Sequence, residues 1–152
     1  MNYYVRTGKL LNPRMGIYAK ANYNPEELAC LLYTPSYISL EYVLQKAGVV
    51  FQYDSRITTI SYLSRQIEVD DMTIIYRKLK GEIIANMKGI SRQSNQVNIA
   101  TTERAFLDLL YLNKNYHFDN LHPLNQKNTF DLLPVYRSNA LTDRVKKLFQ
   151  DD

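Results

Sequence analysis

Residues 34–50 carry apolar side chains at the period of an amphipathic helix. The stripe on one face consists of Leu40, Val43, Leu44 and Ala47. Thr34-Pro35-Ser36 predicts the start of this helix, because a hydroxyl residue caps a helix and proline is tolerated in its first turn. Gly48 predicts its end, since glycine adopts positive φ without steric cost. We expect residues 49–51 to form a strand.

Three further segments combine a capping residue with the sequence pattern of a helix. Residues 100–113 carry an apolar stripe of Ala105, Phe106, Leu109 and Leu110, and Thr101 or Thr102 is a capping hydroxyl. Asn24, Pro25 and two glutamates predict a short helix ahead of residue 33. Ser138 predicts the start of a last helix, whose apolar face consists of Leu141, Val145, Leu148 and Phe149.

The region between the two central helices favours strands. Residues 57–63 are rich in β-branched and aromatic side chains, residues 67–69 form a short partner, and residues 72–79 alternate. Lys80-Gly81 predicts a hairpin tip with residues 82–85 returning. Because the links are short, the fold class is α+β, with a mostly antiparallel sheet packed with about four helices. We read the asparagine-rich residues 113–130 as a loop.

Composition and charge limit the functional classes. The chain has 152 residues, which is one full-sized domain, and a formal net charge of +4, which permits nucleic-acid binding without requiring it. Cys30 is the single cysteine, so no internal disulfide forms, and its apolar neighbours indicate a core position. No signal-like or membrane-spanning apolar run is visible, and we expect a cytoplasmic protein without a membrane partner.

The first twenty residues read as a basic hairpin. Residues 9–11 and 17–19 are short apolar runs joined by the turn residues 12–16. The basic side chains in and beside this hairpin include Arg6, Lys9 and Arg14, and no acidic residue offsets them.

The order PSYISLEYVLQKAG, then short strands, then GIS and ATTERAFLDLLYL resembles the AbiEi-type antitoxins of bacterial phage-defence toxin–antitoxin systems. The resemblance implies two parts: residues 1–20 as a partial winged-helix wing hairpin and residues 21–152 as the antitoxin domain. It also implies an antitoxin that represses its own operon by binding operator DNA. The toxin would be a nucleotidyltransferase-like protein, with direct contact left open. The helix-turn-helix helices expected before a wing are missing, and a truncation, a misplaced start and a true loss all stay open.

The candidate DNA-binding residues are basic. Besides Arg6, Lys9 and Arg14, residues 77–92 contain five cations and a single acidic residue, Glu82. The five cations are Arg77, Lys78, Lys80, Lys88 and Arg92. We expect them to contact phosphates, as such residues do in autorepressors of this kind. A second basic group consists of Arg137, Arg144, Lys146 and Lys147. The alternative interpretation for all these cations is a solvated surface rim that does not bind DNA.

We expect no enzyme, cofactor or metal. His117, Asp119 and His122 are the one cluster that could hold a metal, but their spacing places them poorly on either a strand or a helix. Glu103 and Asp108 are five apart on one helix and read as surface charges. A protein-interaction module without DNA binding is the second hypothesis. A metal-dependent nuclease is the third, and the candidate acids Glu68 and Glu82 lack the lysine that its motif needs.

Overall fold

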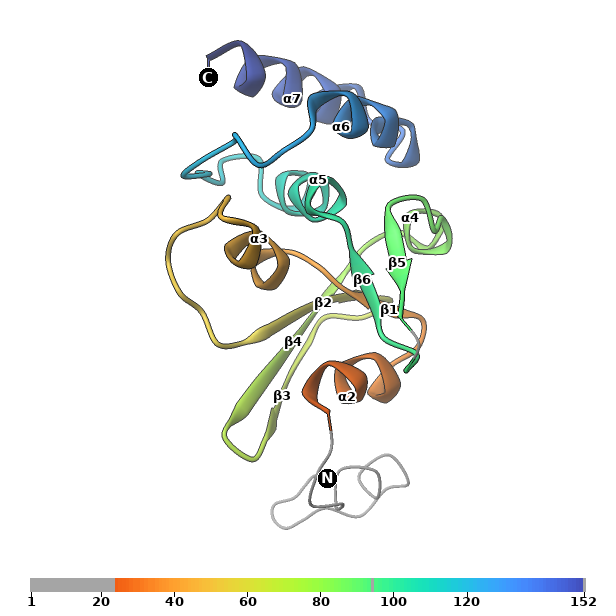
Figure 1. Ribbon diagram of the computed structural model, residues 1–152. Coiled ribbons are helices and arrows are strands. Elements are labelled where there is room, and N and C mark those ends of the chain that lie inside the picture. Colours follow the sequence, from red (N-terminus) through yellow and green to blue (C-terminus); the bar gives the residue numbers. More distant parts are fainter. Residues whose placement is uncertain (1–23, 94, 152) are drawn as a thin grey trace.

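A six-stranded sheet runs through the middle of the protein, with helices on both faces (Figure 1). The computed structural model describes residues 24–93 and 95–151, so the predicted wing hairpin with Arg6, Lys9 and Arg14 lies outside the described residues. The strands are β1 (Ser36–Ile38), β2 (Ile57–Ser61), β3 (Arg65–Val69), β4 (Met72–Lys78), β5 (Ile90–Arg92) and β6 (Asn98–Ala100). The helices are α2 (Pro25–Leu32), α3 (Glu41–Ala47), α4 (Gly81–Ala85), α5 (Thr102–Leu112), α6 (Gln126–Leu132), the 3₁₀ turn η1 (Leu133–Val135) and α7 (Asn139–Asp151).

The sheet is mixed, and its strand order is β3-β4-β2-β1-β6-β5. β2 pairs with β4 in parallel, and β1 pairs with β6 in parallel, whereas the three other pairings are antiparallel. The α+β class is therefore confirmed. The short link of residues 62–64 does not join paired neighbours, because β4 lies between β2 and β3.

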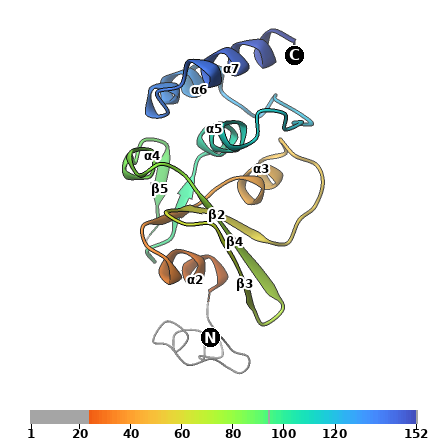
Figure 2. The ribbon, with the colours of Figure 1, turned by 180° about the vertical axis from the view of Figure 1, so that it is seen from behind.

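The two faces of the sheet have separate apolar cores. α2 packs on one face, where Leu28, Ile38 and Tyr76 are almost fully buried. α3 and α5 pack on the other face, around Leu44 and Phe106, and both of these side chains are fully buried as predicted. Figure 2 shows α6 and α7 stacked over α5, which makes an outer layer. α5 is thus covered on two sides.

The predicted start of the helix at Thr34-Pro35-Ser36 is wrong. Ser36–Ile38 is β1, and the helix begins only at Glu41, after Leu40 turns the chain at φ 64°. The Ser36 hydroxyl donates to the carbonyl of Cys30 instead of capping a helix. β1 pairs on both sides, with β2 and β6, and this non-local pairing outweighs the local capping signal.

The end of the same helix follows the prediction. Gly48 adopts φ 84°, and its N–H donates to the last turn of α3. The predicted strand at residues 49–51 does not form. Val49 is fully buried outside any strand, and its carbonyl accepts hydrogen bonds from the N–H groups of Asp119 and Asn120.

Two helices were missed. Gly81–Ala85 is α4, where a hairpin return was predicted, and Ile83 and Ile84 insert into the core. α6 occupies part of the asparagine-rich segment, with Asn125 accepting from the N–H of Asn128 as its cap. The described residues therefore contain six α-helices rather than about four.

The other helix caps match the sequence signals. Asn24 accepts from the first turn of α2, Thr101 caps α5, and the Ser138 hydroxyl accepts from Leu141 N–H at the start of α7. Within residues 24–93 and 95–151, none of the helices combines the length and the apolar character needed to cross a bilayer.

Candidate functional site

Arg104 and Asp108 form an ion pair in the interior. They lie one turn apart on α5, with Arg104 Nε 3.7 Å from Asp108 Oδ1, and neither side chain is exposed. The prediction that Asp108 is a surface charge is therefore wrong. Glu103 accepts from the backbone N–H of Asn125, so it also has a partner within the fold. α5 can bury the pair because it is covered on two sides.

Three hydroxyl groups converge on the Asp108 carboxylate. Tyr37 and Ser39, from β1 and the turn after it, donate to Oδ2 at 2.9 and 2.8 Å. Tyr136, from the chain after η1, donates to Oδ1 at 2.5 Å. Both carboxylate oxygens thus have donors, which compensates the loss of water around a buried charge.

The Arg104 guanidinium binds the chain around α4. Its Nη1 donates to the carbonyls of Asn86 and Lys88 at 2.9 and 2.6 Å, and its Nη2 donates to the carbonyl of Ile83 at 2.9 Å. These carbonyls belong to the end of α4 and the loop that follows, and the Ile83 carbonyl also accepts from the N–H of Asn86. Arg104 therefore fixes the α4–β5 loop against α5.

Burial governs the ionisation of this network. Desolvation raises the pKa of the Tyr37 and Tyr136 phenols well above their ordinary value, and the nearby Asp108 carboxylate adds to the effect. Burial also raises the pKa of the Asp108 carboxyl, which Arg104 and the hydroxyl donors oppose. Since Arg104 and Asp108 are fully buried, the network joins segments of the fold.

The basic residues predicted to bind DNA lie on β4, on either side of α4 and on β5. Arg77 and Lys78 are successive residues of β4, so their side chains point to opposite faces of the sheet. Lys80 is exposed just before α4, and Lys88 is exposed in the loop after it, where its Nζ donates to the Asp131 carbonyl at 2.8 Å. Arg92 is exposed at the end of β5.

The second basic group belongs to the outer helical layer. Arg144 donates to the carbonyl of Leu110 at 3.3 Å, so part of this group holds α7 to α5. Lys146 and Lys147 are exposed on α7, and Arg137 is exposed just before it.

The histidine cluster has little geometry for a metal. His117 Nε2 lies 3.7 Å from Asp119 Oδ1, and the other oxygen of Asp119 accepts from the N–H of Phe51. His122 is exposed, and its N–H donates to the side chain of Asn120. Among the residues that the structure describes, no three histidine, cysteine or acidic side chains gather as metal ligands.

Cys30 lies on the buried side of α2, as the sequence indicated. Burial raises the pKa of its thiol, and its Sγ lies 3.8 Å from the Asn98 carbonyl. A thiol with a raised pKa is mostly protonated at neutral pH and is a weak nucleophile. Cys30 therefore serves as a packing residue.

The structure shows that four further residues form the buried network with Asp108, and the sequence analysis singled out none of them. They are Arg104, Tyr37, Ser39 and Tyr136. One signal was present: Arg104 and Asp108 are i, i+4 partners within a helix that is otherwise apolar on most sides. A comparison with protein-family models, with curated proteins and with solved structures finds no match for this chain.

Proposed function

We propose that the chain is the antitoxin module of an AbiEi-type toxin–antitoxin pair and that it represses its own operon through phosphate contacts with operator DNA. The toxin that it opposes is a nucleotidyltransferase-like protein encoded beside it. The module acts by binding and not by catalysis.

The observation that supports this proposal is the meeting of the three segments that carry the resemblance. Tyr37 and Ser39 come from the first segment, Gly89 begins the second, and Arg104 and Asp108 come from the third. The hydroxyls of the first segment bind Asp108, and Arg104 binds the carbonyl of Lys88 next to Gly89. The three segments that carry the resemblance therefore meet at one buried network, and this meeting supports the proposal.

The proposed DNA contacts rest on unpaired positive charge around α4. Five cations in residues 77–92 face one carboxylate, that of Glu82. Within the described part of the chain, none of the five forms an ion pair with a carboxylate. Arg77 is half-buried and Lys88 also donates to a backbone carbonyl, whereas Lys78, Lys80 and Arg92 are exposed. Exposed cations that form no ion pair are the groups that neutralise DNA phosphates.

Two measurements test the proposal. In the first, the chain is co-expressed with the neighbouring toxin, and growth should be restored. In the second, the chain is titrated with its upstream DNA and with scrambled DNA at two salt concentrations. Phosphate contacts predict weaker binding at higher salt and, for Lys80→Glu, weaker binding to both sequences alike. Lys114→Glu changes an exposed lysine outside the window and serves as the control.

The results that would contradict each half of the proposal are distinct. Continued growth arrest in the presence of the soluble, folded chain would contradict the antitoxin role. Absence of binding to either DNA at low salt would contradict the repressor role and favour a protein-interaction module.

One observation favours that second candidate directly. Phe51 and Tyr53 are 66% and 82% exposed in the connection between α3 and β2, although they are large apolar side chains. The connection is held in place, because Gln45 exchanges two hydrogen bonds with the backbone of Asp54 and Asp119 accepts from Phe51 N–H. Ordered aromatic side chains that project into solvent are typical anchors of protein interfaces.

The double variant Phe51→Ala/Tyr53→Ala tests this candidate. It should fold with unchanged stability and lose toxin neutralisation if these aromatics bind the toxin. Tyr62→Ala, which changes a 46% exposed tyrosine elsewhere on the surface, is the matched control. Full neutralisation by the double variant would exclude the loop as the contact.

A further inference from the structure

β3 is an edge strand of the sheet. It pairs with β4 on one side, and the described residues place no strand on its other side. Figures 1 and 2 show the β3–β4 hairpin extending from the body of the protein. Three exposed side chains, those of Arg65, Gln66 and Glu68, belong to this strand. Because an edge strand presents backbone groups without partners, a further strand can add to the sheet here.

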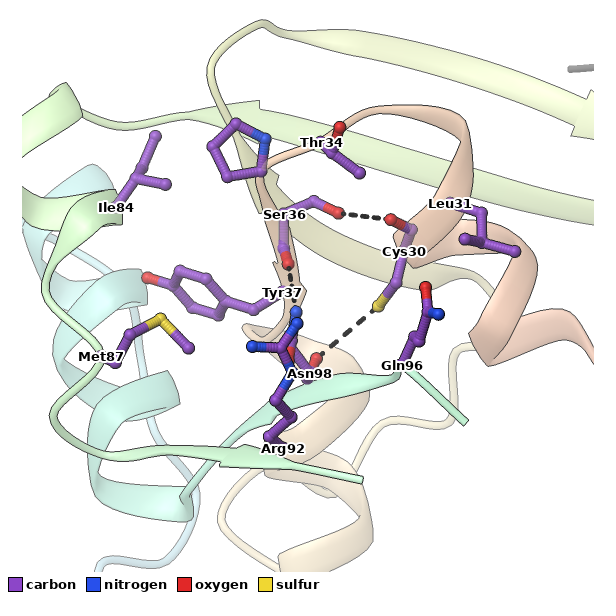
Figure 3. Close-up of a pocket in the computed structure, with 11 residues that line it drawn as sticks. Cys30, Leu31, Thr34, Ser36, Tyr37, Ile84, Met87, Arg92, Gln96 and Asn98 are labelled. Atoms are coloured by element: carbon purple, nitrogen blue, oxygen red, sulfur yellow. Dashed lines mark hydrogen bonds between the residues drawn. The ribbon is translucent and has the colours of Figure 1, made fainter. Parts of the chain in front are cut away.

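The opposite edge of the sheet, β5, offers less to a further strand. β5 has three residues, whereas β3 has five. The N–H of Ile90 on β5 already donates to the Met87 carbonyl. The Arg92 side chain lines a pocket of about 240 Å³ together with Met87 and Asn98 (Figure 3). A strand beside β5 would therefore form few backbone hydrogen bonds, and β3 is the stronger edge.

The register of the hairpin determines which backbone groups of β3 face outward. Val69 pairs with Met72 across a two-residue turn, and residues that flank such a turn bond to each other through their backbones. This pattern alternates along an antiparallel pair, so Gln66 and Glu68 direct their N–H and C=O groups away from β4. The outer edge therefore presents a donor and an acceptor at each of these two residues.

The side chains of β3 are self-complementary in one register. When two copies pair antiparallel about a two-fold axis at Ile67, Gln66 of each copy lies opposite Glu68 of the other. In this register the outward backbone groups of the same two residues also bond to each other. Gln66 Nε2 donates to Glu68 Oε2 at 3.2 Å within one chain, so the two side chains match as donor and acceptor. A shift by two residues would place Glu68 opposite Glu68, which brings like charges together.

Three further features favour the pairing of two β3 strands. Arg65 and Glu68 leave the strand without net charge, so two copies do not repel each other. Ile67 is half-buried on the α2 face, and two of these side chains would meet at the axis and bury more apolar surface. β3 contains no proline, and no bulge interrupts its register with β4, so two of the usual protections of an edge are missing.

We propose that a second copy of this chain binds at β3, with the two β3 strands paired antiparallel and the two sheets joined into one. The two-fold axis passes at Ile67, and a Gln66–Glu68 pair lies on either side of it. Since the contact is short, the dimer dissociates on dilution. It depends on neither the antitoxin role nor DNA binding, so this proposal and the proposed function can fail separately.

Sedimentation of the full chain over a range of concentrations tests the proposal. The protein should change from monomer to dimer as its concentration rises. Gln66→Pro should abolish the dimer, because proline removes an outward N–H and leaves the β3–β4 hydrogen bonds in place. Gln66→Val keeps that N–H and should still dimerise. A monomer at every concentration up to about 1 mM overturns the proposal. A dimer that survives in a folded Gln66→Pro variant also overturns it and points to a contact elsewhere.

Two charge variants test the register and remain decisive if the proline variant does not fold. Gln66→Lys should strengthen the dimer several-fold, because each lysine would face Glu68 of the other copy. Gln66→Glu should weaken it several-fold, because two carboxylates would face each other. Position 66 is exposed, so both variants should keep the parent melting temperature. Lys114→Glu, at an exposed position outside the strand, should leave the dimer unchanged. Equal dimer affinities for the two variants at position 66 overturn the assigned register.

Discussion

Gly89 lies directly against Arg104. A Cβ placed on Gly89 would be 3.2 Å from the Cβ of Arg104 and 3.0 Å from Cδ2 of Leu132. Gly89 also has φ 80°, a conformation that side chains with a Cβ rarely adopt. Its carbonyl accepts from the N–H of Thr101, immediately before α5. The loop after α4 therefore packs so closely against α5 that a side chain at position 89 would crowd Arg104 and Leu132.

Gly89→Ala should destabilise the protein by about 1–3 kcal/mol, because it adds both an overpacked contact and an unfavourable φ. Urea unfolding measures the change. Gly81→Ala is the control, since Gly81 has open space around its missing Cβ and starts α4, and it should be neutral or slightly stabilising. Equal stabilities for the two variants would show that the close approach is absent in solution.

Asp108→Ala should destabilise the protein by about 3–5 kcal/mol, because Arg104 would remain buried without its carboxylate. Three hydroxyl donors would also lose their acceptor. Thermal and urea unfolding measure the effect. Asp143→Ala, at an exposed position of α7, should change stability by less than about 0.5 kcal/mol. A similar loss of unfolding free energy in both variants would contradict the burial of Asp108.

Leu44→Ala and Phe106→Ala should each lower the free energy of unfolding by about 2–5 kcal/mol, since both side chains are fully buried in the core between the sheet and its helices. Phe51→Ala removes a side chain that is 66% exposed, and it should leave stability nearly unchanged. Denaturant midpoints compare the three variants. Parent-like midpoints for both core variants would contradict the assignment of this core.

Alkaline pH should destabilise the fold through the buried phenols. The pKa values of Tyr37 and Tyr136 are raised in the folded state, so the unfolded chain releases these protons first, above pH about 10. The unfolded state then binds fewer protons than the folded state, and stability falls as pH rises. The stability from these groups is fully present below pH about 10.

Tyr136→Phe removes one of the two phenols and should flatten the loss of stability above pH about 10. It also removes a hydrogen bond to Asp108 and should lower stability at neutral pH by about 1–3 kcal/mol. Tyr53→Phe, at a tyrosine 82% exposed, should keep the parent slope. Unfolding free energies across alkaline pH provide the measurement, and a parent slope in Tyr136→Phe would contradict the role of this phenol.

Features set by neighbouring residues were predictable. Asn24, Thr101 and Ser138 cap the helices that the sequence assigned to them, and Gly48 ends α3. The apolar stripes around Leu44 and Phe106 identify core faces in the same way. These signals depend on residues within one or two helical turns, so they do not depend on contacts with distant parts of the chain.

Features set by distant residues were not predictable. Ser36–Ile38 becomes a strand because β2 and β6 pair with it, although the local pattern favours a helix start. Asp108 is buried because β1 and the chain after η1 bring Tyr37, Ser39 and Tyr136 against it, which no pattern within α5 reveals. Met87 and Asn98 line one pocket only through the strand order, so their shared site was invisible in the sequence.

The parallel pairing of β1 with β6 joins two segments that are made at different times during synthesis. Ile38 lies opposite Ile99, so one side of β1 has no sheet partner until β6 has been made. At the usual ~5–20 residues per second, the ribosome needs about 3–12 s to add the intervening chain. β1 and β2 form an antiparallel pair that can meet early, whereas the pairing of β1 with β6 must wait for the later part of the chain. Through that interval, β1 remains an open edge that can recruit a strand from another chain.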